Sequence, residues 1–162
     1  MWPTVIDLLR HGEPEGGQRY RGKRDDPLSE LGWQQMRDLL PVNKPWQQII
    51  TSPLKRCSAF AEDLARQTGL PLAYEPGLRE IDFGDWEGRL LSDVQRDDAE
   101  NWQRFWDEIG TARPPGGESM QEVADRAVPA LEGLIKEHRG EHILIVAHGA
   151  GNRGLACHLL NM

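Results

Sequence analysis

The feature that most constrains this chain is an arginine–histidine pair at the end of its first apolar run. Arg10 and His11 follow the mainly apolar residues 4–9 and precede Gly12. Ending a buried strand with two basic side chains is costly unless an anion binds there. The Arg10 guanidinium offers a fixed fork of donors to phosphate oxygens, and the His11 ring can accept a phosphoryl group or a proton. His148 follows residues 143–147 in similar surroundings, so two histidines at two strand ends suggest one site.

Length and composition are those of a globular domain. The chain has 162 residues, of which 38% are hydrophobic and 28% are charged, and a formal net charge of −7. We therefore expect a single domain over residues 1–162. The negative charge argues against a nucleic-acid partner. Because no apolar segment approaches membrane-spanning length and no signal peptide is visible, we expect a cytoplasmic protein without a membrane partner.

Basic residues nevertheless gather near His11. They are Arg10, Arg19, Arg21, Lys23 and Arg24. Two interpretations stay open: a solvated basic loop, or a positive mouth that attracts an anionic substrate.

Only two cysteines occur, Cys57 and Cys157, and they lie far apart. Their spacing matches neither a disulfide framework nor a metal site, which suits a reducing compartment. Cys57 directly follows Arg56, but the residues after it lack the glycine-rich anion-binding loop that a cysteine phosphatase needs. We therefore predict no metal or other cofactor and no cysteine nucleophile.

Apolar periodicity predicts alternating strands and helices. The predicted strands cover residues 4–9, 46–51, 70–74 and 141–147. The predicted helices cover residues 29–40, 52–67, 119–138 and 151–160, with one or two more between 90 and 109. This order predicts an α/β protein, three-layered α/β/α with a mostly parallel central sheet.

Capping signals set several of these helix boundaries. Ser52 followed by Pro53 predicts a helix start, and Ser119 with Glu122 forms a capping box. Ser29 is expected to cap the first helix, whose inner side would carry four apolar residues. These are Leu31, Met36, Leu39 and Leu40.

Parallel strands would bring distant side chains together. Arg10 and His11 follow the first strand, Arg56 lies in the first turn after the second strand, and His148 follows the last. Ligands of open parallel sheets bind beyond the carboxyl ends of the strands. His148 and Gly149 also precede a helix, where free backbone N–H groups favour anions. We therefore expect these groups to surround one anion.

These residue types suit phosphoryl transfer, which requires held oxygens, an in-line nucleophile and an acid. Arg10 and Arg56 can hold the oxygens and His148 can donate a further hydrogen bond. His11 can attack through a neutral nitrogen, because nearby arginines lower its pKa. Glu80 lies in a loop whose apolar neighbours could raise its pKa, so we predict that it is the acid.

With these residues, the chain resembles the histidine phosphatase superfamily, also called the phosphoglycerate mutase-like family. The resemblance rests on collinear motifs across nearly the whole chain: Arg10-His11-Gly12-Glu13, Ser52-Pro53-Leu54-Lys55-Arg56, Leu78-Arg79-Glu80, Phe83-Gly84-Asp85-Trp86-Glu87-Gly88, Gly117-Glu118-Ser119 and Ala147-His148-Gly149. It implies a covalent phosphohistidine on His11, a phosphate pocket of Arg10, Arg56 and His148, and Glu80 as proton donor and later base. It implies no metal.

Within the family, the chain looks most like alpha-ribazole phosphatases and their relatives. The resemblance implies hydrolysis of a small phosphate ester, and we predict Gly17, Arg21 and Gly149 as further substrate-binding positions. Many members carry an asparagine where this chain has Gly17. Members of this type also continue beyond the last helix into another strand, whereas this sequence stops at Met162. The sheet edge left open could pair with a second copy.

Three other functions stay open: a mutase-type phosphotransferase, a phosphatase acting on phosphohistidine or another phosphoprotein, and, ranked last, a non-catalytic phosphate-binding protein. Mutases carry a Glu-Arg pair that Glu80-Ile81 does not reproduce. Trp102, Phe105 and Trp106 recur at helical spacing; we expect two to pack in the core and one to reach the pocket.

Overall fold

A computed structural model describes residues 2–160. Its sheet is formed by β1 (Val5–Arg10), β2 (Gln48–Thr51), β3 (Leu72–Tyr74) and β4 (His142–Ala147). Its helices are α1 (Glu30–Asp38), α2 (Lys55–Thr68), α3 (Leu91–Asp97), α4 (Ala99–Asp107), α5 (Met120–Glu137) and α6 (Gly149–Leu159). Two short 3-10 turns, η1 (Pro76–Leu78) and η2 (Gly84–Trp86), precede α3. The end of the chain at Met162 lies outside the described residues.

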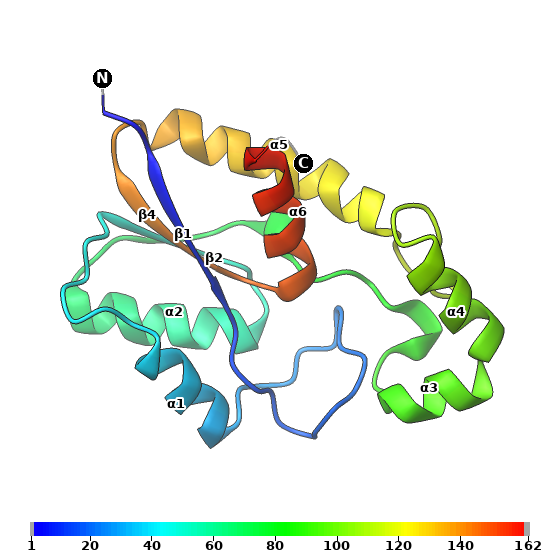
Figure 1. The fold of residues 1–162 in the computed structure, drawn as a ribbon. Helices are drawn as coiled ribbons and strands as arrows, with labels where there is room; N and C mark the ends of the chain where they lie inside the picture. The colour runs from blue at the N-terminus through cyan, green and yellow to red at the C-terminus, as the bar shows by residue number, and fades with distance from the viewer. Residues whose placement is uncertain (1, 161–162) are drawn as a thin grey trace.

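The four strands run parallel in the order β1-β4-β2-β3. Helices α1 and α2 cover one face of this sheet, and α5 and α6 cover the other (Figure 1). The predicted three-layer α/β/α architecture with a parallel sheet is therefore confirmed. The pair α3 and α4 lies beyond the sheet, on the side of its carboxyl ends (Figure 1).

Alternation along β4 explains the two faces. Leu144 and Val146 pack with α1 and α2, while Ile143, Ile145 and Ala147 pack with α5 and α6. Successive strand side chains point to opposite faces, so this nearly continuous apolar run supplies both cores. A third apolar cluster joins the α3–α4 pair to the loops that precede it, around buried Trp86 and Phe105.

Two predicted capping signals are confirmed, and one predicted helix start is wrong. Ser29 caps α1, and the capping box of Ser119 and Glu122 forms as expected. Helix α2, however, begins at Lys55 rather than at Ser52-Pro53. Its first N–H group donates to Asp25 Oδ1 at 2.6 Å, so a loop carboxylate takes the capping role.

The inner face of α1 is narrower than predicted. Met36 is fully buried and Leu40 is partly buried, whereas Leu31 and Leu39 are 54% and 69% exposed. The helix has nine residues and touches the core with one edge only. No helix in residues 2–160 combines the length and apolarity needed to cross a membrane.

Candidate active site

Strand pairing sets the distance between the two motif histidines. Arg10 of β1 is the register partner of Ala147 of β4, and the His11 N–H donates to the Ala147 carbonyl at 3.1 Å. The residues that follow these partners, His11 and His148, therefore leave the sheet side by side. Their rings meet edge to face with centroids 5.2 Å apart.

The His11 ring has a defined tautomer. Its Nδ1 lies 2.8 Å from the Gly12 carbonyl oxygen, which can only accept, so Nδ1 carries the proton. In the neutral ring Nε2 then keeps its lone pair. Burial, together with the positive charges of Arg56 and Arg10, lowers the pKa of His11 from 6.5 to about 4. A neutral ring with a free lone pair on Nε2 can act as a nucleophile.

Arg56, in the first turn of α2, is completely buried. Its Nη1 donates to the Arg24 carbonyl at 2.8 Å and its Nη2 to the Gly22 carbonyl at 2.9 Å. Its buried Nε has no hydrogen-bond partner among the described residues. A buried unpaired donor is costly, and Arg56 lines the cavity, so its guanidinium carries positive charge to the edge of that space.

Glu87 holds the loop that positions Arg56. Its Oε1 accepts N–H groups from Gly22 at 2.9 Å, Lys23 at 3.1 Å and Phe83 at 3.0 Å, and its Oε2 accepts from Arg24 at 3.2 Å. Sequence reasoning assigned no role to this carboxylate. Its place in the glycine-punctuated stretch 83–88 indicated a loop, but not which backbone it would bind.

Gly149 lets Arg10 lie against the start of α6. A Cβ atom at this position would come within 3.2 Å of Arg10 Nε and 3.3 Å of Arg10 Cζ. Gly149 and Ala150 both line the cavity, so the positive end of the helix faces it as well.

His148 lies behind His11. It is fully buried, and Cys57, Ser52 and Glu80 surround its ring. Its Nε2 is 2.7 Å from Ser52 Oγ, and its Nδ1 is 3.9 Å from Glu80 Oε2. Burial and the charge of Arg56 hold its pKa well below the usual value. His148 is not among the cavity-lining residues, so its expected contact with substrate stays a prediction.

Glu80 has a carboxylate oxygen within 4.8 Å of a ring nitrogen of His11 and of His148. Its side chain is 11% exposed, and its Oε1 accepts the N–H of Ile81 at 3.1 Å. Burial raises the pKa of Glu80, although the charges of Arg56 and Arg10 act against it. A raised pKa is the property required of a general acid.

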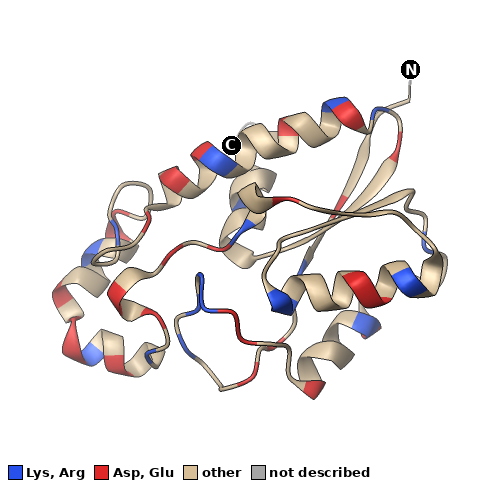
Figure 2. Cartoon of the chain, turned by 180° about the vertical axis from the view of Figure 1, so that it is seen from behind, with Lys and Arg blue, Asp and Glu red and all other residues tan. Residues whose placement is uncertain are grey.

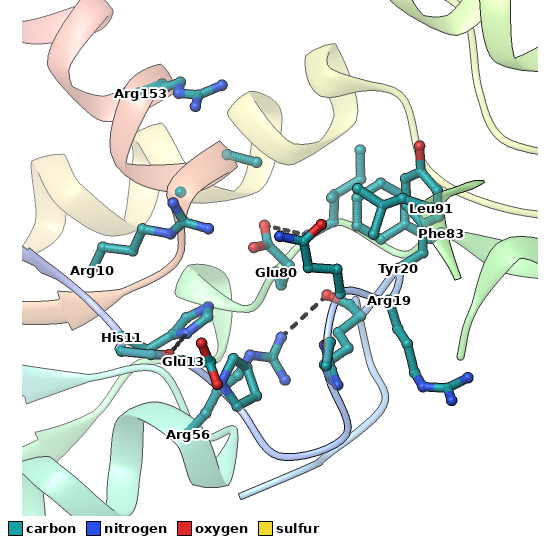
Figure 3. A pocket seen from close by; sticks show the side chains of 18 of the residues that line it. Arg10, His11, Glu13, Arg19, Tyr20, Arg56, Glu80, Phe83, Leu91 and Arg153 are labelled. Atoms are coloured by element: carbon teal, nitrogen blue, oxygen red, sulfur yellow. Dashed lines mark hydrogen bonds between the residues drawn. The ribbon is translucent and has the colours of Figure 1, made fainter. Parts of the chain in front are cut away.

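These groups share one cavity of about 590 Å³. Arg10, His11, Arg56 and Glu80 lie around its polar end, and Figure 3 shows their side chains directed toward a common space. Figure 3 shows Tyr20, Phe83 and Leu91 on the side away from Arg10. Together with the other large apolar lining residues they form what we call the apolar wall: Tyr20, Phe83, Leu91, Phe105, Trp106, Ile109 and Met120.

The aromatic prediction was partly wrong. Phe105 and Trp106 both line the cavity, whereas one residue of the helix was expected to do so. Trp102 donates its Nε1–H to Tyr20 Oη at 2.9 Å and packs in the third cluster. The apolar wall is consequently wider than predicted.

Arg21 and Gly17 also line the cavity, and both belong to the loop before α1. The Arg21 guanidinium is engaged within that loop: Nε binds Asp26 at 2.8 Å and Nη1 binds the Gly17 carbonyl at 2.6 Å. Arg21 therefore stabilises the loop, and substrate binding by Arg21 or Gly17 remains a prediction.

The basic cluster of this loop is largely neutralised. Lys23 pairs with Asp82 at 2.9 Å, and Arg24 pairs with Asp26 at 2.9 Å. Figure 2 shows red and blue segments interleaved along it. Arg10 and Arg56 nevertheless bring positive charge to the cavity, and Arg19 and Arg153 also line it.

His11, Glu80 and His148 could also offer three ligand atoms to a metal, since these atoms lie within 4.8 Å of one another. Arg10 and Arg56 stand next to this trio and place positive charge where a cation would bind. The arrangement consequently favours an anion.

Comparison with known proteins agrees with this geometry. Residues 6–162 match the family described as "Histidine phosphatase superfamily (branch 1)". The uncharacterized phosphatase PhoE of Bacillus subtilis is 34% identical over 156 residues, covering 94% of this chain and 75% of PhoE. A Mycobacterium tuberculosis protein named as bifunctional is 33% identical over 151 residues, covering 90% of this chain. The chain spans only 41% of that relative's length.

Solved structures agree as well. The alpha-ribazole phosphatase of Shigella flexneri superposes with a TM-score of 0.83 at 30% identity, covering 97% of this chain and 80% of that one. Because the family match extends over nearly the whole sequence and the relatives share its fold, this chain belongs to the histidine phosphatase superfamily.

Proposed function

We propose that this protein hydrolyses small phosphomonoesters through a covalent phosphohistidine on His11. One observation carries the proposal: the His11 Nδ1–H is fixed on the Gly12 carbonyl, so Nε2 keeps a lone pair at the cationic end of the cavity. The neutral state of His11 allows attack, and Arg10 with Arg56 supplies the opposing charge for the phosphate oxygens.

In the first step Nε2 of His11 attacks phosphorus and the bond from phosphorus to the ester oxygen breaks. Glu80, protonated because of its raised pKa, gives its proton to the departing alcohol oxygen. The Arg56 guanidinium, which lines the cavity, binds an oxygen of the transferring group. If the Ser52 hydroxyl donates to His148 Nε2, then His148 Nδ1 carries a proton and can donate it to a second oxygen of the transferring group.

In the second step water attacks phosphorus and the bond from phosphorus to Nε2 breaks. The Glu80 carboxylate, now deprotonated, accepts the proton from water. Inorganic phosphate leaves, Glu80 is again protonated and His11 is again neutral. No group outside the chain is needed for this proton balance.

The apolar wall supports an ester whose alcohol part is aromatic or otherwise apolar. Phe83, Phe105 and Trp106 offer flat aromatic surfaces to the cavity, and Figure 3 shows Phe83 across from Arg10. Alpha-ribazole phosphate is a substrate of this kind, and the Shigella flexneri structure named above gives it a precedent within the same fold. A wall made only of polar or charged side chains would instead suit an ester whose alcohol part is small and negatively charged.

The test is to trap the intermediate. After brief exposure to a ³²P-labelled ester, the wild-type protein should carry acid-labile, base-stable label, and His11→Ala should carry none and lose turnover. His158→Ala is the matched control, since His158 lies on the exposed side of α6 and pairs with Glu132. Substantial turnover by a folded His11→Ala variant would exclude the mechanism.

A substrate screen separates the remaining possibilities. Aromatic nucleoside-like phosphates should have higher kcat/KM than phosphoglycerates or a phosphohistidine-bearing protein. If a phosphoprotein is hydrolysed fastest, the small-ester proposal is wrong. If the protein binds the ³²P-labelled ester but hydrolyses none of the esters, it is a phosphate-binding protein and not a phosphatase.

A further inference from the structure

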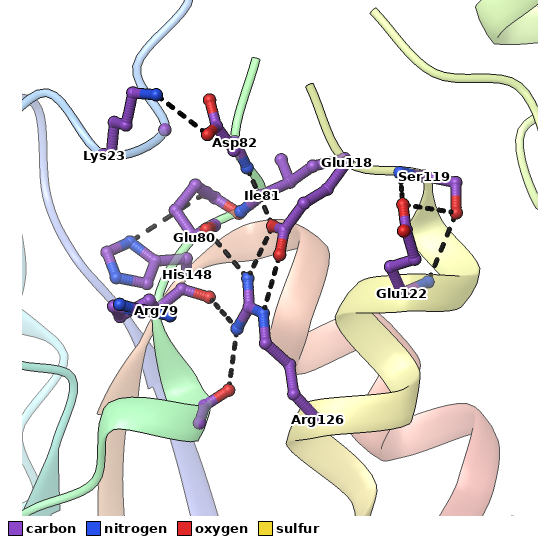
Figure 4. Close-up of polar contacts among 12 residues, drawn as sticks. Lys23, Arg79, Glu80, Ile81, Asp82, Glu118, Ser119, Glu122, Arg126 and His148 are labelled. Atoms are coloured by element: carbon purple, nitrogen blue, oxygen red, sulfur yellow. Dashed lines mark hydrogen bonds and ion pairs between the residues drawn. The ribbon is translucent and has the colours of Figure 1, made fainter. Parts of the chain in front are cut away.

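One arginine of α5 fastens the segment that carries Glu80. The Arg126 guanidinium has five N–H donors, and five hydrogen bonds to it are present (Figure 4). Nη1 donates to the carbonyls of Gly77 and Arg79, both at 2.8 Å, and Nη2 donates to the carbonyl of Glu80 at 2.9 Å. A single rigid side chain thus fixes three carbonyls within four residues.

Glu118 completes this attachment. Its two carboxylate oxygens take the remaining Arg126 donors, Nε at 3.2 Å and Nη2 at 3.0 Å. The same Oε2 accepts the N–H of Asp82 at 2.9 Å, and the Glu118 N–H donates to the Asp82 carbonyl at 2.8 Å. The backbone is therefore held at Glu80 itself and on both sides of it.

The Glu80 carboxylate has few polar contacts of its own. Its carboxylate accepts one N–H, from its neighbour Ile81, and stands 3.9 Å from the His148 ring. Its direction consequently depends on the backbone from which it projects. That backbone lies between η1 and η2, outside the sheet, and Arg126 and Glu118 connect it to the α5 region.

We propose that Arg126 and Glu118 are positioning residues for Glu80, holding its carboxyl group at the distance from the cavity that proton transfer requires. Neither residue lines the cavity, so neither touches substrate. The inference rests on the proposed function, because it assumes that Glu80 is the general acid. A misplacement of about 1 Å can lower a rate by about a hundredfold, so loss of this attachment should be measurable.

Arg126 also acts on Glu80 through charge. Its positive charge favours the carboxylate and opposes the effect of burial on the Glu80 pKa. Geometry and charge can be separated, because Arg126→Lys keeps the charge but cannot reach all five acceptors, whereas Arg126→Met removes both. Glu118→Gln keeps the size of the side chain and weakens the ion pair.

The experiment measures kcat/KM, which reports phosphoryl transfer, for two esters. p-Nitrophenyl phosphate has a leaving group that departs without a proton, whereas an alkyl phosphate needs one. Arg126→Met, Arg126→Lys and Glu118→Gln should each lower kcat/KM for the alkyl ester, by on the order of 10- to 100-fold for Arg126→Met. The loss for p-nitrophenyl phosphate should be a few-fold at most. The basic limb of the pH profile should move to higher pH in Arg126→Met and stay in place in Arg126→Lys.

Arg113→Met is the matched control. Arg113 pairs with Glu122 of α5 at 3.0 Å and has no ion pair with residues 77–82 among the described residues, so both esters should keep wild-type kcat/KM. A double-mutant cycle completes the test: in a Glu80→Gln background, Arg126→Met should cause no further loss.

The outcomes are distinct. Equal losses for the two esters in folded Arg126 and Glu118 variants, or additive losses in the cycle, would overturn the positioning role. If Arg126→Met does not fold, Arg126→Lys and Glu118→Gln decide the question by the same comparison of kcat/KM losses between the alkyl ester and p-nitrophenyl phosphate. Failure of the proposed function would appear differently, as absence of labelled phosphohistidine or of leaving-group dependence in Glu80→Gln with the wild-type positioning residues intact.

Discussion

His11 and His148 meet edge to face, 5.2 Å apart, because each directly follows one member of the register pair Arg10 and Ala147. Two ionised imidazoles at this separation would repel each other in a buried site that already contains Arg56. The pKa of each ring is lowered, so both stay neutral at neutral pH. One can then attack phosphorus while the other serves as a hydrogen-bonding partner.

This arrangement predicts the titration of His11. Its pKa is lowered to about 4, so its ring should remain neutral at pH 5 and become protonated near pH 4. Imidazole NMR, with the signal assigned by its loss in His11→Gln, measures this directly. Arg10→Met removes one of the charges that lower the pKa and should move the titration upward. A wild-type midpoint near 6.5 would contradict the electrostatic description.

The same shift bears on stability. Because the unfolded chain binds a proton on this ring at a higher pH than the folded chain does, folding stability should decrease as pH falls from 6.5 toward 4. His11→Gln should remove part of that dependence. Urea unfolding of both proteins at several pH values in this window tests the difference.

Gly149 provides a second prediction. A Cβ at this position would press on the Arg10 guanidinium, so Gly149→Ala should displace Arg10 and weaken binding of inorganic phosphate by about tenfold. Gly154→Ala is the control on the same helix, where a Cβ would meet nothing within 4 Å. It should leave binding unchanged and stabilise α6 by about 0.5–1 kcal/mol. If Gly149→Ala and Gly154→Ala bind phosphate with equal affinity, then Gly149 plays no part in phosphate binding.

A third prediction concerns Glu87, which has four backbone hydrogen bonds. Glu87→Gln places an amide N–H₂ against N–H donors, so the loop of Gly22 and Arg24 should lose its anchor. Because the carbonyls of that loop hold Arg56, we expect KM for a phosphate ester to rise and the melting temperature to fall. The stability loss should be about 1–3 kcal/mol. Asp85→Asn, a neighbouring exposed carboxylate, should change neither quantity.

Much of the site follows from the sequence because a parallel sheet collects its carboxyl ends at one edge. Four residues lie at the end of a strand or in the turn after it, so their meeting needed only the correct element order: Arg10, His11, Arg56 and His148. Glu80 belongs to no strand end. Its place was inferred from the family resemblance and from its apolar neighbours.

The supporting residues could not be predicted in the same way. Glu87 binds N–H groups more than 60 residues away, and Arg126 binds carbonyls nearly 50 residues away. Such pairings depend on how irregular loops fold against each other, and no periodicity encodes them. Ser52 shows what sequence patterns miss. Ser52 followed by Pro53 suggested a helix cap, but the Ser52 hydroxyl contacts His148, and Asp25 caps α2 instead.

A last prediction concerns the apolar wall. Trp106 lines the cavity yet is 43% exposed, so it can contact a ligand without supporting the core as buried Phe105 does. Trp106→Ala should therefore lower kcat/KM for a bulky aromatic phosphate by about 10-fold, the equivalent of about 1.4 kcal/mol of lost apolar contact. Binding of inorganic phosphate, which has no alcohol part, should not change. Trp2→Ala is a suitable control, since Trp2 is 85% exposed and does not line the cavity. If Trp106→Ala affects inorganic phosphate and the aromatic ester equally, the wall acts on the fold of the site and does not select the alcohol.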